Sequence, residues 1–595
     1  MTAPESTEHA ATAAELNEAL THHRLGEVAI AAQGYRRVLA KAPGTIEAWQ
    51  LLALAIDGGA SEAASCVLLR AASLPSGSPE LLGSVGGILA KKGLVKAANL
   101  ALRRSVALAP SSAGTWNGKG VASRLAGDFD AAIAELQRAI ALERGFPDAV
   151  DNLTAIYLRC GEARRARQLL DASPIGDGGP GLLARRVSIS LLLDEEPPET
   201  TLRLAREFER RYVTSENQLG YVERSREPDR RLRIGYVSGN AFRMHTTAMV
   251  LLPVFRNHDR REVEVFCYSD VLEQDEDHVT DLFRSHASTF RVTGSLDDAG
   301  LAQLIREDRI DVLVDSLGFA AGSRLLALGR RPAPVQVNWM AMGSFGMRAV
   351  GYAVADNLLV PPDADRCFDE KVVRVSCGYV CEPLLPLPPP PLSQRRNGPV
   401  TFGSLNQLAK LSERTLDLWA RILAAAPRSR LLLKAEVQAG SAVVERIRAR
   451  FADRGIAGNR IEFEPWRSTY QDHLAVYDQI DVALDTVPYG GATTTLEALL
   501  MGVPVVSQIG DRVLGRYGYM FLATLGLDDL AAASDRDYVR IAIELAADVE
   551  RRKELRGTLR TRLLASPICD GARMARELEG AYREMWREWC GQPPS

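Results

Sequence analysis

The sequence lacks the long apolar runs and the excess of one charge that direct a protein to membranes or to nucleic acid. No run of about 18 apolar residues occurs in it. Its first residues, MTAPESTEHAATAAEL, are polar and acidic, whereas a secretion signal is basic and then apolar. Lys plus Arg number 72 against 75 Asp plus Glu, for a formal net charge of -3. We therefore expect a cytoplasmic protein with no membrane span and no nucleic acid partner.

Common cofactor and metal motifs are also missing. Neither residues 230–381 nor residues 400–590, the two parts of the chain that alternate strands with helices, contain GxGxxG or GxxxxGKS/T, which leaves standard dinucleotide and P-loop binding unsupported there. No HExxH pattern is present, and the closest of the eight cysteines, Cys377 and Cys381, lack the two-residue gap of a zinc knuckle or a redox motif. The sequence therefore predicts no metal site and no bound cofactor, and it predicts cysteines that stay reduced.

The first region is repetitive. At 595 residues the chain is too long for one core, so two to four domains are expected. Glycines that would break helices recur at intervals of 33 or 34 residues, at Gly26, Gly59, Gly93, Gly127 and Gly161. A period of 34 resembles the tetratricopeptide repeat, in which pairs of antiparallel helices stack into a solenoid.

One repeat unit shows the pattern most clearly. One large residue and several small or aliphatic ones stand where two packed helices meet, at Trp116, Gly120, Ala132, Leu136 and Ala139. We count four to five such units in a repeat domain at 14–175 and expect its concave groove to hold a protein acceptor. A helical spacer without a ligand is the alternative.

The rest of the chain predicts two α/β domains. A helical linker at 176–229 contains the amphipathic segment TLRLAREFERRYV. Short apolar strands then alternate with helices at 230–381 and again at 400–590, which is typical of parallel sheets covered on both faces. A Pro-rich connector at 382–399 separates the two series. The predicted fold class is an α-solenoid followed by two Rossmann-like domains, with a cleft at the carboxyl ends of their strands.

A phosphate site is predicted in the second α/β domain. In DVALDTVPYGGATTTLEALLMGVPV a strand ends at Asp485, a Gly-Gly turn follows, and three threonines open a helix that carries Glu497. Free N–H groups at a helix start suit a phosphate, and an acid one turn later could hold a ribose. An ordinary turn with a Thr cap is the alternative. Lys410 follows the first strand of this domain and His245 follows the first strand of the other, where each could equally be a surface residue.

Five segments in fixed order carry a resemblance to a known family. The segments are LRIGYVSGNAFRMHTTAMVLLPVF, LGRRPAPVQVNW, TFGSLNQLAKLSERTLDLWARIL, DVALDTVPYGGATTTLEALLMGVPVVS and SPICDGARMARELEGAYREMW. They resemble the catalytic region of protein O-GlcNAc transferases and their plant O-fucosyltransferase relatives of the SPINDLY type, over about Leu232 to Trp589. These are family 41 glycosyltransferases of GT-B fold preceded by tetratricopeptide repeats. The resemblance implies an enzyme that transfers a sugar from a nucleotide-sugar donor with inversion and without a metal.

The resemblance also implies roles for individual residues. His245 falls on the family histidine near acceptor and sugar, either as a base or as a positioning group, and Lys410 falls on the catalytic lysine at the diphosphate. The donor would be held at the diphosphate by Gln407, at the base by His473, at the phosphate by Thr493 and Thr494, and at the ribose by Glu497.

Three departures from the family leave the donor open among UDP-, GDP- and CMP-sugars. Ala492 stands where the O-GlcNAc enzymes have histidine, which is closer to the fucosyltransferases. The family loop GYPGTSG is replaced by AMGSFG, which contains Gly343 and Ser344, and Phe319 stands where relatives carry His or Tyr. We expect Phe319, Gly343 and Ser344 to border the sugar or the acceptor.

The acceptor is also open. Bacterial relatives with a short repeat array include flagellin glycosyltransferases, which use nonulosonic acids, so Ser or Thr of flagellin is the favoured acceptor. The alternatives are an O-GlcNAc or O-fucose transferase acting on other cytoplasmic proteins, an Asn glucosyltransferase, and a repeat scaffold or adaptor that no longer turns over.

Overall fold

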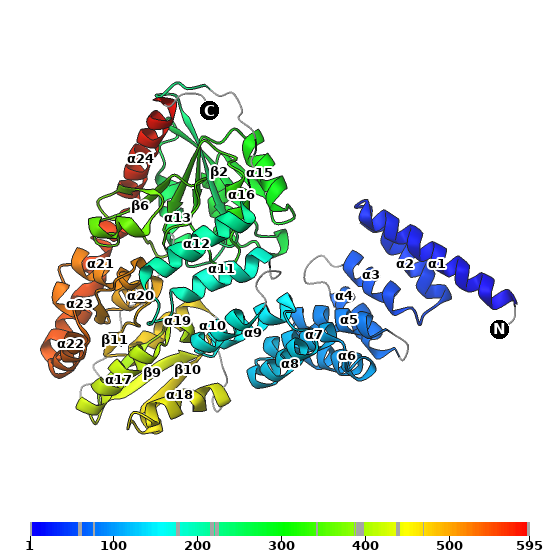
Figure 1. Ribbon diagram of the computed structural model, residues 1–595, viewed down its shortest axis with the longest axis horizontal. Coiled ribbons are helices and arrows are strands. Elements are labelled where there is room, and N and C mark those ends of the chain that lie inside the picture. Colours follow the sequence, from blue (N-terminus) through cyan, green and yellow to red (C-terminus); the bar gives the residue numbers. More distant parts are fainter. Residues whose placement is uncertain are drawn as a thin grey trace. The chain divides into compact units, whose positions relative to one another are not determined.

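The computed structural model describes residues 3–56, 62–74, 78–173, 179–214, 219, 225–340, 343–385, 387, 398–435, 441–467 and 469–591 (Figure 1). The chain divides into two compact units, Met1–Tyr157 with Gln168–Gly179, and Leu158–Arg167 with Pro180–Ser595. Within the described residues, no helix combines the length and the apolar character needed to cross a membrane. The predicted fold class is confirmed, because a helical repeat region precedes two parallel α/β domains.

The first unit is a row of paired helices. Small residues let the helices of a pair approach closely: a Cβ on Gly86 would lie 2.5 Å from Leu102 Cγ, and one on Gly120 would lie 2.6 Å from Leu136 Cγ. The periodic glycines arise at the turns between paired helices, where Gly93 and Gly127 have φ of 74° and 79°. Gly59 lies outside the described residues. The helices are α1 (Ala3–Arg24), α2 (Val28–Lys41), α3 (Ile46–Ile56), α4 (Glu62–Ser73), α5 (Pro79–Lys91), α6 (Val95–Leu108), α7 (Ala113–Leu125), α8 (Phe129–Leu142), α9 (Pro147–Arg159) and α10 (Ala163–Ala172).

The first α/β domain has a seven-stranded parallel sheet in the order β3-β2-β1-β4-β5-β6-β7. Its strands contain several β-branched residues and are mostly buried, so in the sequence they appear as short runs of mainly apolar residues. The first strand pairs with both the second and the fourth, and the chain reverses direction across the sheet at this point. The strands are β1 (Leu232–Ser238), β2 (Val263–Ser269), β3 (Thr289–Val292), β4 (Val312–Asp315), β5 (Val335–Trp339), β6 (Tyr352–Ala355) and β7 (Lys371–Arg374), and the helices are α13 (Ala248–Asn257), α14 (His278–His286), α15 (Asp298–Glu307) and α16 (Leu325–Gly329).

Two helices in the segment 176–229 belong to the core of this domain. They are α11 (Gly179–Ser190) and α12 (Pro198–Tyr212). Leu183 of α11 and Phe208 of α12 are buried in one cluster with Leu313 of the sheet. The amphipathic segment that we expected to connect domains therefore buries its apolar face against the first α/β domain.

The second α/β domain has a six-stranded parallel sheet in the order β10-β9-β8-β11-β12-β13. Strands β8 and β11 are neighbours that lead to opposite halves of the sheet, and the crevice at such a switch point binds ligands in open α/β sheets. The strands are β8 (Thr401–Ser404), β9 (Arg430–Ala435), β10 (Ile461–Pro465), β11 (Val482–Leu484), β12 (Val505–Gln508) and β13 (Ala531–Ala532). The helices are α17 (Glu413–Ala425), α18 (Ala442–Ala452), α19 (Tyr470–Ala475), α20 (Thr493–Leu500), α21 (Tyr517–Thr524), α22 (Asp535–Ala547), α23 (Val549–Leu564) and α24 (Gly571–Gly591).

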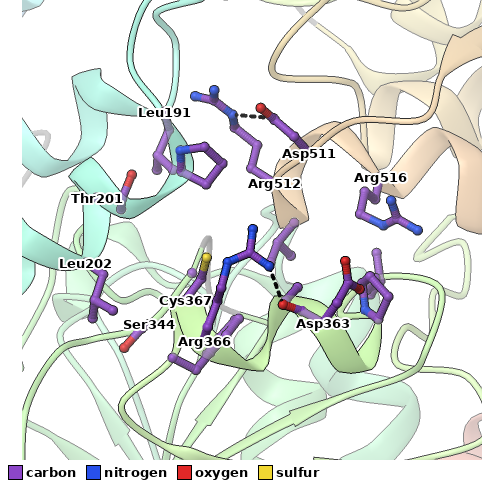
Figure 2. Close-up of a pocket in the computed structure, with 17 residues that line it drawn as sticks. Leu191, Thr201, Leu202, Ser344, Asp363, Arg366, Cys367, Asp511, Arg512 and Arg516 are labelled. Carbon is purple, nitrogen blue, oxygen red and sulfur yellow. Dashed lines mark hydrogen bonds and ion pairs between the residues drawn. The ribbon is translucent and has the colours of Figure 1, made fainter. Parts of the chain in front are cut away.

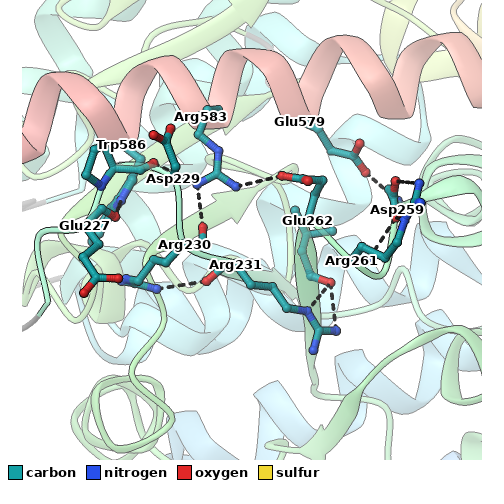
Figure 3. A network of polar contacts seen from close by, with 12 residues as sticks. Glu227, Asp229, Arg230, Arg231, Asp259, Arg261, Glu262, Glu579, Arg583 and Trp586 are labelled. Atoms are coloured by element: carbon teal, nitrogen blue, oxygen red, sulfur yellow. Dashed lines mark hydrogen bonds and ion pairs between the residues drawn. The ribbon is translucent and has the colours of Figure 1, made fainter.

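The last helix, α24, crosses back to the first α/β domain (Figure 3). Arg583 donates to the carbonyl of Arg230 at 2.6 Å, and Trp586 Nε1 donates to the carbonyl of Glu227 at 3.1 Å. Glu579 accepts from the buried His258 at 2.8 Å. These contacts join the two α/β domains, whereas the Pro-rich connector lies mostly outside the described residues.

Candidate active site

Asp485 organises the turn at the switch point. It follows β11 directly, and its side chain is buried. Its Oδ1 accepts from the N–H groups of Gly491 at 2.5 Å and Thr486 at 3.0 Å, and its Oδ2 accepts from Ser507 Oγ at 2.8 Å. Burial raises the pKa of the Asp485 carboxyl, and these donors together with Lys410 oppose the rise. The carboxyl therefore fixes the Gly-rich turn to the sheet.

Both positions of this turn require glycine, because a Cβ at either one would clash with a neighbouring side chain. A Cβ on Gly490 would lie 2.8 Å from Asp485 Oδ2, and one on Gly491 would lie 2.6 Å from Thr495 Oγ1. Helix α20 then begins with Ala492 as its N-cap, which makes no side-chain cap hydrogen bond. By contrast, Ser412 caps α17 through its hydroxyl. The first turn of α20 therefore presents N–H groups and the positive end of its dipole to an anion.

Lys410 is bonded to the same turn. It ends a 3-10 turn, Leu408–Lys410, a few residues after β8. Its Nζ donates to the carbonyl of Gly490 at 2.8 Å and to Asn406 Oδ1 at 3.3 Å, and it lies 4.1 Å from the centroid of the Tyr489 ring. Burial lowers the pKa of Lys410 to about 8, against the attraction of Asp485. A phosphate at the start of α20 would therefore meet a cation that the turn itself holds in place.

Thr493 and Thr494 lie at the start of α20 and make contacts that position this end of the helix. Burial raises the pKa of the Tyr379 hydroxyl, and a hydrogen bond with Thr493 opposes the rise. The Tyr379 ring packs edge-on against Tyr517 at 5.3 Å. The carbonyl of Thr494 accepts from the Tyr477 hydroxyl at 2.9 Å.

Glu497 and His473 form a buried pair one turn further along. Glu497 Oε2 lies 3.0 Å from His473 Nε2, and the two side chains are 6% and 13% exposed. Burial raises the pKa of Tyr470 and of Tyr477, and the Glu497 carboxylate adds to both rises. Polar groups thus surround the carboxylate at the position predicted to hold a ribose.

His245 lies in the other domain, just before α13. Its Nδ1 accepts from the N–H of Thr247 at 3.1 Å. Because an amide N–H can only donate, the neutral ring carries its proton on Nε2. Burial lowers the pKa of His245, and Arg243 adds to this effect, so the neutral form is favoured. In this geometry His245 offers a hydrogen-bond donor at Nε2 and has no free lone pair for a proton.

This tautomer distinguishes the two roles that remain open for His245. If the ring positions a substrate by donating from Nε2, His245→Gln should keep transfer within about tenfold, because the amide nitrogen replaces that donor. His245→Ala should lose about 100-fold or more in kcat. The measurement is steady-state transfer at saturating donor for both variants. Equal losses in Gln and Ala would instead identify the ring as the base.

Gln407 and Phe319 are placed differently from the cluster around α20. The Gln407 side chain is exposed, and the backbone carbonyl of Gln407 accepts from the backbone N–H of Lys410 at 3.0 Å. Phe319 is 7% exposed and packs edge-on against Phe208 of α12, with ring centroids 5.3 Å apart. Contact of Phe319 with a sugar stays a prediction, while its packing against α12 gives it a structural role.

Gly343 and Ser344 border a cavity of about 190 Å³ (Figure 2). Ser344 donates to the buried Glu370 at 2.5 Å, and the Gly343 carbonyl accepts from Asn338 at 2.9 Å. The preceding Ala341 and Met342 lie outside the described residues. The cavity is bordered by Leu191, which follows α11, by α12, by the turn at 361–368 and by the loop at 511–516, which carries Arg512 and Arg516.

The structure brings five predicted residues to one edge of the second sheet: Lys410, His473, Thr493, Thr494 and Glu497. Asp485, Asn406, Lys434 and Tyr379 belong to the same site and were not predicted. For Asp485 and Lys434 a signal exists in the sequence, since each stands at the carboxyl end of an apolar run. Among the described residues, no cluster of three or more His, Cys, Asp or Glu side chains is placed to hold a metal. Metal independence stays a prediction.

Two Rossmann-like sheets and an uncapped helix start beside a half-buried lysine are typical of GT-B glycosyltransferases. Residues 205–381 and 394–578 match Glycosyl transferase family 41, and residues 124–180 match the tetratricopeptide repeat. The chain therefore belongs to glycosyl transferase family 41.

The relatives include plant and bacterial proteins. The chain is 34% identical, over 68% of its length, to a probable UDP-N-acetylglucosamine–peptide N-acetylglucosaminyltransferase SPINDLY of Oryza sativa subsp. japonica, and 36% identical over 66% of its length to that of Solanum lycopersicum. It spans 44% and 42% of these two relatives. A solved mutant O-GlcNAc transferase of Thermobaculum terrenum is 34% identical, with a TM-score of 0.65 and 99% of each chain covered.

Proposed function

We propose that this protein transfers a sugar from a nucleotide-sugar donor to Ser or Thr of a protein acceptor. One observation carries the proposal: a half-buried lysine, an uncapped helix start and a buried carboxylate meet at the switch point of the second sheet. The lysine would balance the diphosphate charge, the helix start would bind a phosphate, and the carboxylate would hold the ribose. The plant relatives and the Thermobaculum terrenum protein are named as peptide N-acetylglucosaminyltransferases or O-GlcNAc transferases.

The chemistry follows from the leaving group. A hydroxyl that attacks the anomeric carbon displaces a nucleotide phosphate, which gains negative charge in the transition state. Lys410 and the N–H groups at Thr493 and Thr494 would stabilise that charge without a metal. In-line attack from the opposite face inverts the anomeric centre. His245, in the first α/β domain, would donate from Nε2 to the sugar or the acceptor.

The donor remains open among UDP-, GDP- and CMP-sugars. Gly343 and Ser344 supply the cavity of about 190 Å³ that we propose for the sugar or the acceptor. Burial lowers the pKa of Arg516 in its wall, and this side chain donates to the Leu358 carbonyl at 2.6 Å. Guanidinium and hydroxyl groups together suit a hydroxylated or acidic sugar.

The acceptor would be held by the repeats. Polar side chains of neighbouring repeats bond to each other: Asn152 Nδ2 donates to Asn117 Oδ1 at 3.1 Å, and Gln50 Nε2 donates to Ser84 Oγ at 2.7 Å. Side-chain amides spaced one repeat apart can bind the backbone of an extended peptide. We favour flagellin as that acceptor, because the short repeat array is similar to that of flagellin glycosyltransferases.

The test is the intact mass of flagellin from source cells with and without this chain. A ladder of equal increments that disappears in the deletion is the expected result, and the increment identifies hexosamine, deoxyhexose or nonulosonic acid. Peptide mapping assigns the sugar to Ser or Thr rather than Asn. An unchanged flagellin mass would exclude flagellin, and failure to modify any protein captured by the repeats would leave the adaptor alternative.

A further inference from the structure

Four side chains contact one another in a row at the carboxyl edge of the second sheet: Trp466, Lys434, His473 and Glu497. Lys434 near the end of β9 lies with its Nζ 3.2 Å from His473 Nδ1 and 4.3 Å from the centroid of the Trp466 ring. His473 Nε2 in turn lies 3.0 Å from Glu497 Oε2. They come from β9, from the residue after β10, from α19 and from α20. The two ends of this row of side chains are therefore an exposed indole and a buried carboxylate.

The contact with Lys434 determines where the imidazole carries its proton. A lysine ammonium has three donors and no acceptor, so His473 Nδ1 must supply a lone pair to it. The proton of the neutral ring is then on Nε2 and points at Glu497. With the other tautomer, Nδ1–H would face the ammonium and the Nε2 lone pair would face the carboxylate. Both contacts would be lost.

This arrangement matters because Glu497 is buried. A carboxylate with a side chain only 6% exposed needs donors in place of water. The Nε2–H of His473 is such a donor and keeps one carboxylate oxygen engaged. The orientation of the carboxylate toward a nucleoside thus depends on Lys434 through its contact with His473.

Trp466 also contacts the Lys434 ammonium. Its indole is 60% exposed, which is unusual for tryptophan, and its ring lies within cation–π range of Lys434 Nζ. In the sheet, Lys434 pairs with Glu464, two residues before Trp466. The strand register therefore places the indole beside the ammonium.

We propose that Lys434 is a positioning residue of the donor site. It fixes His473 as the Nε2–H tautomer, and through His473 it aims Glu497 at the nucleoside of the donor. This rests on the proposed function, in which His473 and Glu497 hold the nucleoside. Trp466 supports the same arrangement by confining the ammonium.

The first test is nucleotide binding by the full chain, with UDP, GDP and CMP as separate probes. Lys434→Met has a similar length but no donor, and we expect it to weaken the nucleotide that the wild type binds by about tenfold. Lys434→Arg keeps a donor and should stay within about threefold. Arg430→Met is the matched control, since it removes a cation from the other end of β9, where Arg430 pairs with Glu462. Transfer measured over a range of donor concentrations should show a raised KM for the donor and little change in kcat.

The second test reads the tautomer directly. Nitrogen-15 NMR of the labelled histidines, with His473 assigned from His473→Gln, should show an unprotonated Nδ1 in the wild type and a mixture of tautomers in Lys434→Met. Unchanged tautomer and unchanged nucleotide binding in Lys434→Met would overturn the proposal. If the wild type binds none of the three nucleotides, the proposed function fails and with it the role of Lys434 in donor binding. A shifted tautomer would then still establish the link between Lys434 and His473.

Discussion

Replacing Lys410 with alanine is expected to lower kcat by about 10²- to 10³-fold while the protein remains folded. The Lys410 ammonium bonds to the Gly490 carbonyl and lies beside the start of α20, where the leaving phosphate would gain charge. Loss of this cation removes stabilisation that is stronger in the transition state than in the bound donor, so kcat falls more than KM rises. The measurement is steady-state transfer with a thermal melt of the same sample.

The pH profile provides the control. Because burial lowers the pKa of Lys410 to about 8, the ammonium loses its proton as pH rises through this value. The kcat/KM of the wild type should therefore fall above pH about 8. Lys410→Arg stays charged and should lose this alkaline limb. Lys553→Ala, which changes an exposed lysine of α23, should behave as the wild type. An alkaline limb that survives in Lys410→Arg would show that another group titrates.

Replacing Asp485 with alanine is expected to destabilise the second α/β domain by about 2–4 kcal/mol. The change leaves the N–H groups of Gly491 and Thr486 and the hydroxyl of Ser507 without their acceptor in a buried site. The Gly-rich turn then loses its attachment to β11, so activity should fall together with stability. Differential scanning calorimetry should show an apparent Tm lower by about 5–10 °C for the transition of this domain.

Asp485→Asn separates hydrogen bonding from charge. Its amide oxygen can still accept from Gly491 and Thr486, so most of the stability should be kept. Lys410 loses the carboxyl that opposes the burial effect on its pKa, so the alkaline fall in activity should move to lower pH. If Asn and Ala destabilise equally, charge rather than hydrogen bonding holds the turn.

Much of the site could be predicted because its signals are local. The strand that ends at Asp485, the two glycines and the helix from Thr493 are contiguous, and each has a physical requirement that the residue types reveal. Lys410 and Glu497 could be assigned by their place after a strand and within a helix. Phe319 could not be placed, because its packing partner Phe208 belongs to a segment that looked like a linker.

The repeat region, the two α/β series and the helix start that suits a phosphate can be read from the residues alone. They depend on periodicity and on turn chemistry within a few residues. The fold is needed to see that Lys410 bonds to Gly490, 80 residues away, and that Lys434, His473 and Glu497 contact one another in a row. Strand order and the length of each crossover determine which ends of strands become neighbours. Hydrogen bonds between such neighbours leave no periodic trace in the sequence.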